Sequence, residues 1–223
     1  EKALSIIDCV TSIGACNVPT DEWGLDIVAS GSQKGYMIPP GLSFISVSEK
    51  AWEACDKSNL PKFYLDLKYY KKSLNNNSNP YTPAVNLVFA LEESLKMMQE
   101  EGLENIFQRH EKHKLAVSNA IQALNLKLFA DNKSLSPSIT AIESTQMDAE
   151  AFRKTIKEKY DILLAGGQDH LKGKIFRVGH LGYINDRDIM IAISAIGLTL
   201  LEQKLISTEE LGSALQVAKT HLQ

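Results

Sequence analysis

The sequence predicts an α/β protein, and three observations support that prediction. Short apolar runs rich in β-branched residues alternate with segments whose apolar residues recur every three or four positions. Proline and glycine stand near the ends of several of these segments, where they start or stop regular structure. A lysine also follows one apolar run directly, in Ser30-Gly31-Ser32-Gln33-Lys34-Gly35. We therefore expect a sheet with candidate functional side chains just after the ends of its strands.

Composition narrows the classes of partner. The 223 residues suffice for one large domain or two modest ones, and 44% hydrophobic with 23% charged residues is typical of a globular protein. A net charge of −3 without a basic block argues against nucleic acid as a partner. No apolar run approaches the roughly 20 residues that cross a bilayer. The three cysteines are odd in number and lack metal-ligand spacing, so we expect reduced thiols, a cytoplasmic protein and no metal site.

The first half of the sequence predicts three strands and two helices. Ser48 is a suitable N-cap for the first helix, with Ala51 and Trp52 facing inward. The polar stretch 60–79 contains paired aromatics and three consecutive asparagines, and we expect a long loop with a short strand there. The expected strands are Leu4–Val10, Asp26–Ala29 and Leu42–Val47. The expected helices are Ser48–Lys57 and Pro83–Glu101. The apolar face of the second helix is expected to consist of Val85, Val88, Phe89, Leu91, Leu95 and Met98.

Gly102 ends or kinks that helix, and a further helical pattern covers Leu103–Leu124. We place a domain boundary near its middle, which gives a first domain at 1–110 and a second at 111–223. The second domain mixes strands and helices. Its expected strands are Leu126–Phe129, Ser138–Ile142, Ile162–Ala165 and Ile175–Val178. Its expected helices are Asp148–Tyr160, one that begins near Asn185, and Glu209–His221. The helix that begins near Asn185 has Ile189, Ile193, Ile196 and Leu200 on one face.

Lys34 and Asp8 each lie at or just past the end of an expected strand. A lysine amine can bond covalently to a carbonyl cofactor, and glycines beside it keep space open. A buried aspartate needs a partner, which the protonated ring nitrogen of such a cofactor supplies. Ligands of open α/β sheets bind beyond the carboxyl ends of strands, so one ligand could touch both residues, with Val10 against its ring. Two alternatives stay open: Lys34 as a solvated loop lysine, and Asp8 as the cap of the turn at Thr11-Ser12.

Two segments, Asp8–Ser12 and Asp26–Gly35, resemble the class V aminotransferases of pyridoxal phosphate (PLP) fold type I, which are aspartate aminotransferase-like. The family pattern is Asp, then Val two residues later, then Ser-Gln-Lys, and the spacing from Asp8 to Lys34 fits it. The nearest members are alanine–glyoxylate and serine–glyoxylate (serine–pyruvate) aminotransferases. Cyanobacterial relatives of these enzymes are often labelled as the small, tritium-exchange subunit of soluble hydrogenase.

The resemblance implies PLP as the cofactor and assigns roles to four residues of the first segments. Lys34 would bond to the cofactor aldehyde and act as general base, and Asp8 would pair with the pyridinium nitrogen. Val10 would pack against the ring, and Gln33 would donate to the phosphate.

Two later segments also resemble the family. Asn79–Ala84 implies that Thr82 reaches the phosphate of a neighbouring subunit, and hence a homodimer. Lys174–Gly182 implies that Arg177 clamps the substrate carboxylate. Read alone, each residue has an ordinary structural alternative: Thr82 as an N-cap and Arg177 as a solvent-facing strand residue.

The resemblance implies an aminotransferase that moves an amino group between a small amino acid, alanine or serine, and a 2-oxo acid such as glyoxylate or pyruvate. The alternatives are a PLP-dependent lyase or desulfurase, which needs a reactive cysteine, and a non-catalytic assembly subunit. The family's N-terminal half-domain, with its Ser-Gly-Thr-like phosphate loop, has no match here. We therefore expect a partial large domain with a mainly parallel sheet, a small C-terminal α+β domain, and an absent N-terminal portion, without which PLP binding is in question.

Overall fold

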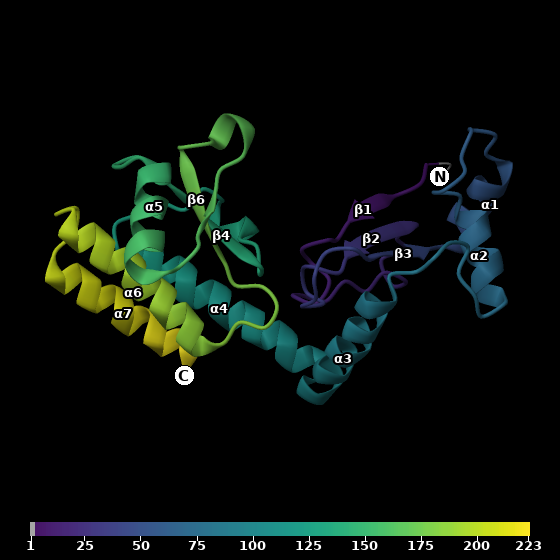
Figure 1. The fold of residues 1–223 in the computed structure, drawn as a ribbon. Helices are drawn as coiled ribbons and strands as arrows, with labels where there is room; N and C mark the ends of the chain where they lie inside the picture. Colours follow the sequence, from purple (N-terminus) through teal and green to yellow (C-terminus); the bar gives the residue numbers. More distant parts are fainter. Residues whose placement is uncertain (1–2) are drawn as a thin grey trace. The chain divides into compact units, whose positions relative to one another are not determined.

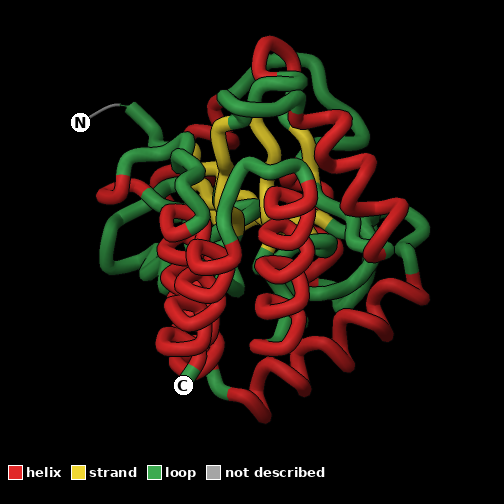
Figure 2. The backbone as a smooth tube through the Cα atoms, turned by 90° about the vertical axis from the view of Figure 1, so that its left-hand side faces the viewer, coloured by secondary structure: helices red, strands yellow, loops and turns green. Residues whose placement is uncertain are grey.

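The computed structural model describes residues 3–223, and the chain divides into two compact units. Unit 1 ends at Glu101 and unit 2 covers Gly102–Gln223. We expected the boundary near residue 110, inside a helix. The structure divides the chain at Gly102 instead, where a backbone φ of 83° separates two helices. Helices form much of the backbone and the strands are short (Figure 2).

The sheet of unit 1 has the strand order β1-β2-β3 (Figure 1). The strands are β1 (Ile6–Asp8), β2 (Ile27–Gly31) and β3 (Ser43–Val47). The expected parallel pairing is found between β1 and β2, where Asp8 lies opposite Ala29, whereas β3 joins β2 antiparallel. β1 is shorter than predicted because the chain turns after it, with the carbonyl of Cys9 accepting from Ser12 and Ile13 N–H groups.

A buried carboxylate, Asp26, joins the start of β2 to its neighbours. It accepts hydrogen bonds from Ser5 N at 2.9 Å, Ser48 Oγ at 3.0 Å and Lys50 Nζ at 3.0 Å. The Ser5 N–H first, and then Lys50, lower the pKa of Asp26 to about 2. Ser48 also caps α1 (Glu49–Lys57) by accepting from Ala51 N, so the predicted N-cap is confirmed.

The expected loop with a short strand at 60–79 was wrong, because the structure has the helix α2 (Leu67–Asn75) there. Asp66 is its N-cap and accepts from Lys68 N at 3.0 Å. The aromatic residues before and within α2 gather around Tyr81, whose ring centroid lies 4.7 Å from that of Tyr64 and 6.2 Å from that of Tyr70. The sequence signal for this helix is the N-cap Asp66 followed by residues with helical spacing, and the polar composition of the stretch led us to overlook it.

The helix predicted from Pro83 is α3 (Val85–Glu101), and only part of its predicted face is packed. Four of the six residues expected to face the core are exposed: Val85, Val88, Phe89 and Leu95. The less exposed stripe combines two predicted residues, Leu91 and Met98, with Leu87 and Ser94, and the four are spaced as one helix face. Ser94 donates to Tyr36 O, so a polar residue occupies the centre of this face and hides it from a hydrophobic pattern.

The turn after β1 and the loop after β2 touch through their backbones. A Cβ built on Gly35 would lie 2.2 Å from Ile13 O, and one on Gly14 would lie 2.8 Å from the Cα of Gly35. Gly14 also has a φ of 82°, which favours glycine. This close approach fixes the end of β1 against the end of β2.

Unit 2 contains four long helices and a second sheet, with strand order β4-β6-β5 and both pairings antiparallel. The predicted strand Leu126–Phe129 is reduced to one bridge, from Leu128 to Ile142. The strand expected at Ile162–Ala165 is shorter and begins later. The elements are α4 (Leu103–Ala123), β4 (Ile139–Glu143), α5 (Ala149–Tyr160), β5 (Ala165–Gly166), β6 (Ile175–Gly179), α6 (Asp186–Glu202) and α7 (Thr208–Leu222), with short 3-10 turns at Asn132–Ser134 and Asp169–Leu171.

The core of unit 2 lies between the helices and one face of this sheet. Phe176 and Val178 alternate on β6 toward that core, and the ring of Phe152 on α5 lies 5.2 Å from that of Phe176. The predicted stripe of α6 is confirmed, because Ile189, Ile193, Ile196 and Leu200 are all buried. Arg177 therefore alternates onto the opposite face of β6.

Buried histidines hold the segment that follows β6. His180 donates its backbone N–H to Ser138 O, and its ring nitrogens lie 2.9 Å from Thr140 Oγ1 and 3.0 Å from Pro137 O. His110 Nε2 accepts from Gly182 N at 3.1 Å. Burial first, with the nearby histidines as an additional cause, lowers the pKa of His180 to about 4.

We predict that Gly35→Ala destabilises unit 1 by about 2–3 kcal/mol, because the added methyl group must push two backbones apart. Both tryptophans, Trp23 and Trp52, lie in unit 1, so urea unfolding followed by tryptophan fluorescence measures the effect. An unchanged urea midpoint for Gly35→Ala would contradict the close approach.

We predict that unit 2 loses stability as the pH falls from about 6.5 to about 4. The unfolded chain protonates His180 near its ordinary pKa, whereas the folded chain stays neutral until about pH 4, so the unfolded state binds more protons in this window. The pKa difference corresponds to roughly 3 kcal/mol. Urea unfolding followed by circular dichroism should show a smaller pH dependence for His180→Asn than for the wild type. Equal pH dependence of the two proteins would refute the assignment.

Candidate active site

The loop that carries Lys34 is closed by Ser32, which is fully buried. Ser32 Oγ donates to Pro39 O at 2.8 Å and accepts from Leu42 N at 3.1 Å, and Ser32 N donates to Leu42 O at 3.0 Å. These bonds join the two ends of the eleven-residue connection between β2 and β3. Reasoning from sequence did not assign this role to Ser32. Its one local signal is a small hydroxyl residue between the strand and the lysine.

Lys34 is half-buried at the exit of β2, and its carbonyl accepts from Met37 N at 2.9 Å. Its amine makes no hydrogen bond or ion pair with the residues that the structure describes. Gly35 adds no side chain beside it. An amine without a protein partner, held on a closed loop, is suited to bond with the carbonyl of a ligand.

Asp8 is the last residue of β1 and is exposed, so the expectation of a buried aspartate was wrong. Its Oδ1 accepts from Val10 N at 2.9 Å, which makes Asp8 the cap of its own turn at Val10 rather than at Thr11-Ser12. No ion pair joins Asp8 to a basic residue within the described part of the chain. Its second oxygen is therefore open to a donor from outside.

Val10 and Gln33 meet beside Gly31. A Cβ built on Gly31 would lie 3.0 Å from Gln33 Oε1 and 3.7 Å from Val10 Cγ1. The missing side chain of Gly31 thus leaves a small cradle between an apolar group and an amide. Because the ends of β1 and β2 are parallel neighbours, the structure brings Asp8, Val10, Gln33 and the Lys34 loop to one edge of the sheet.

Thr82 lies outside this group. It is exposed, three residues before α3, and its hydroxyl makes no hydrogen bond with the described residues, so the N-cap alternative is not realised. The neighbouring Tyr81 donates its hydroxyl to Phe63 O at 3.1 Å. Thr82 is therefore presented on the surface of unit 1.

Arg177 belongs to unit 2, where it sits half-buried on β6, the central strand. Its Nε donates to Gly166 O at 2.9 Å. Its outer nitrogens, Nη1 and Nη2, have no hydrogen bond or carboxylate partner among residues 3–223. A guanidinium fixed at Nε with a free outer edge can bind both oxygens of a carboxylate. The alternative of a fully solvent-facing arginine is not what the structure shows.

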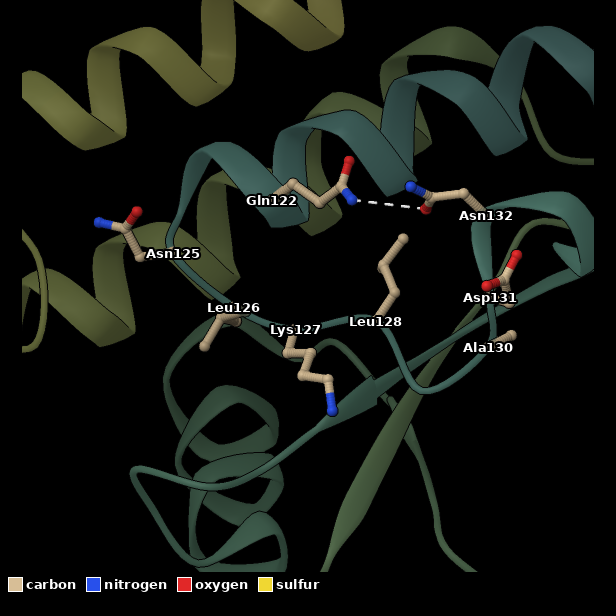
Figure 3. Close-up of a pocket in the computed structure, with 8 residues that line it drawn as sticks. All are labelled: Gln122, Asn125, Leu126, Lys127, Leu128, Ala130, Asp131 and Asn132. Carbon is tan, nitrogen blue, oxygen red and sulfur yellow. Dashed lines mark hydrogen bonds between the residues drawn. The ribbon is translucent and has the colours of Figure 1, made fainter.

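A hollow of about 440 Å³ beyond the end of α4 is a separate feature (Figure 3). It is lined by Gln122, Asn125, Lys127 and neighbouring residues, and Gln122 donates to Asn132 Oδ1 at 3.5 Å. None of the predicted site residues lines it. Over residues 3–223 the structure shows no group of three histidine, cysteine, aspartate or glutamate side chains that could hold a metal, and no helix long and apolar enough to span a bilayer.

Comparison with known proteins identifies the family. Residues 1–180 match the family described as Aminotransferase class-V. Among curated relatives, a protein named the small subunit of soluble hydrogenase from Synechococcus sp. is 58% identical over 90% of this chain and 52% of its own length. The L-aspartate–glyoxylate aminotransferase of Paracoccus denitrificans is 37% identical over 98% of this chain and 55% of its own length.

A solved structure supports the fold. The ureidoglycine–glyoxylate aminotransferase of Bacillus subtilis superimposes with a TM-score of 0.88 at 30% identity, over 97% of this chain and 58% of that one. The chain thus spans about half the length of the curated relatives it matches. The expected fold class, PLP fold type I, is confirmed, and PLP is the cofactor on which the family depends. The chain belongs to the class V aminotransferase family.

Proposed function

We propose that this chain is part of a PLP-dependent aminotransferase. The enzyme would move an amino group between a small amino acid, alanine or serine, and a 2-oxo acid such as glyoxylate or pyruvate. The observation that supports the proposal most is the meeting of Asp8, Val10, Gln33 and the Lys34 loop at one sheet edge, in a family that uses PLP. The three unpaired cysteines agree with a cytoplasmic protein.

The residues present fit the cofactor. The unpaired amine of Lys34 would hold its aldehyde, and the open oxygen of Asp8 would accept from its ring nitrogen. Val10 and Gln33 bound the cradle beside Gly31, and they would offer an apolar group to the ring and an amide to the phosphate. The exposed, unpartnered hydroxyl of Thr82 is available to the phosphate of a second subunit, which favours a homodimer.

PLP supplies an electron sink for the carbon that bears the amino group. Unit 1 would contribute a base and a carboxylate to this chemistry, and unit 2 a cation that binds the substrate carboxylate. Lys34 Nζ would be the base that takes the proton from the substrate α-carbon and later gives a proton back. Asp8 would pair with the ring nitrogen and favour its protonated form, and Arg177 would hold the substrate carboxylate through Nη1 and Nη2.

The relatives support glyoxylate as the amino acceptor. The Paracoccus and Bacillus proteins differ in the amino donor that their names give, but both names contain glyoxylate. The amino donor differs between these relatives, so we propose alanine or serine as donor, and the rates of amino transfer from each decide between them.

Two other functions remain in competition. The 58% identical relative carries the name of a hydrogenase subunit, which favours a non-catalytic assembly role. A desulfurase or lyase needs a reactive thiolate, and burial first raises the pKa of both Cys9 and Cys16. Raised thiol pKa values leave little thiolate of Cys9 and Cys16 at neutral pH, and Cys55 lies within the helix α1 rather than on a loop, so the cysteine-dependent reading is disfavoured.

We predict that borohydride reduction in the presence of PLP attaches the cofactor to Lys34, because its amine is the unpaired one on the closed loop. Mass spectrometry of the digested protein should find the adduct on the peptide that contains Lys34, and Lys34→Arg should abolish it. The same experiment is repeated on a chimera in which the N-terminal half of the Synechococcus relative precedes this chain. The chimera supplies the half of the relative that this chain does not match. An adduct in neither protein would favour the assembly role.

We predict that Asp8→Asn lowers the rate of amino transfer from alanine or serine at least about a hundred-fold, since an amide cannot hold the ring nitrogen protonated. The borohydride adduct on Lys34 should still form. Asp21→Asn, an identical change at an exposed position of unit 1, is the control and should leave the rate unchanged. Bleaching of the cofactor absorbance on addition of the amino acid gives the rate. Full activity of Asp8→Asn would remove Asp8 from the site.

A further inference from the structure

A second arginine, Arg153 on α5, supports the backbone to which Arg177 is bonded. Arg153 Nε donates to Leu164 O at 2.8 Å, just before β5, and its Nη1 pairs with Glu150 Oε2 at 2.8 Å. Arg177 Nε donates to the carbonyl of Gly166, within β5. The two guanidinium groups thus hold neighbouring carbonyls of one short segment of unit 2.

β5 has little other support. It is two residues long, lies at an edge of its sheet and pairs with β6 alone. A strand with so few ladder bonds opens easily unless side chains hold it. The Glu150–Arg153 pair also fills the space beside it, because a Cβ built on Gly166 would lie 2.5 Å from Arg153 Nη1 and 2.8 Å from Glu150 Oε1.

We propose that Arg153 and Glu150 are positioning residues for Arg177. The proposal rests on the proposed function, in which Arg177 holds the substrate carboxylate. Arg153 holds β5 in place, the Gly166 carbonyl fixes Nε of Arg177, and the guanidinium plane is thereby set with Nη1 and Nη2 directed outward as a fork. Glu150 neutralises Arg153, so an incoming carboxylate meets one uncommitted guanidinium and binds in one orientation.

The side-chain Nε–H of Arg177 reports this directly by NMR, in the 223-residue protein and without cofactor. Its signal is assigned by its disappearance in Arg177→Lys. Arg153→Ala should accelerate its solvent exchange about ten-fold, the population change that one hydrogen bond of ordinary strength supports. A global loss of folding would instead shift the backbone amides of α6, which are recorded in the same sample.

Two further variants keep the test decisive. Gly166→Ala displaces Arg153 without removing any charge and should accelerate the same exchange. Glu158→Gln, which breaks the exposed Lys154–Glu158 pair on the same helix, should leave it unchanged. Unaltered exchange in both Arg153→Ala and Gly166→Ala overturns the proposal, as does equal acceleration in Glu158→Gln.

A separate titration judges the role of Arg177 itself. Pyruvate should shift the Arg177 Nε signal of the wild type, acetone, which lacks the carboxylate, should not, and Arg153→Ala should weaken the pyruvate response about ten-fold. If pyruvate causes no shift in the wild type while the exchange effect stands, the carboxylate role fails and the positioning of Arg177 is upheld. If pyruvate binds equally well to Arg153→Ala, the positioning role fails.

Discussion

Gly14 and Gly35 lie against each other because the turn after β1 and the loop after β2 cross with no side chain between them. That contact, rather than any long side chain, sets the position of the loop that bears Lys34 relative to the end of β1. Ser32 closes the same loop on its other side with three hydrogen bonds. A site built on strand ends and tight backbone contacts holds its geometry better than one built on free loops.

In unit 2, side-chain hydrogen bonds rather than backbone contacts hold the candidate site residue Arg177 in place. Arg177 stands on the central strand of its sheet, but its orientation depends on a carbonyl from a two-residue edge strand. The side chain of Arg153 from α5 supplies support that so short a ladder lacks, and buried histidines hold the segment that follows β6. The cost is sensitivity to acid, because neutral imidazoles are part of the packing.

Local signals made much of the fold predictable from sequence. Ser48 as a cap and the four-residue stripe of α6 were correct because each depends on neighbours a few positions away. The packed face of α3 was predicted only in part, at Leu91 and Met98, because Ser94 occupies its centre. The exposure of Asp8 was missed because the chain turns at Cys9. The site residues came from a motif, whereas the Glu150–Arg153 pair depends on segments that meet only in the folded unit.

β1 is an edge strand whose Ile6 and Ile7 side chains are 69% and 37% exposed. Its outward backbone amides have no strand partner among the described residues, so they exchange hydrogen with solvent almost as fast as a loop. Any additional strand that docks there, from the same polypeptide or another, slows them. Deuterium uptake at these few amides is thus a gauge of sheet extension that needs neither cofactor nor substrate.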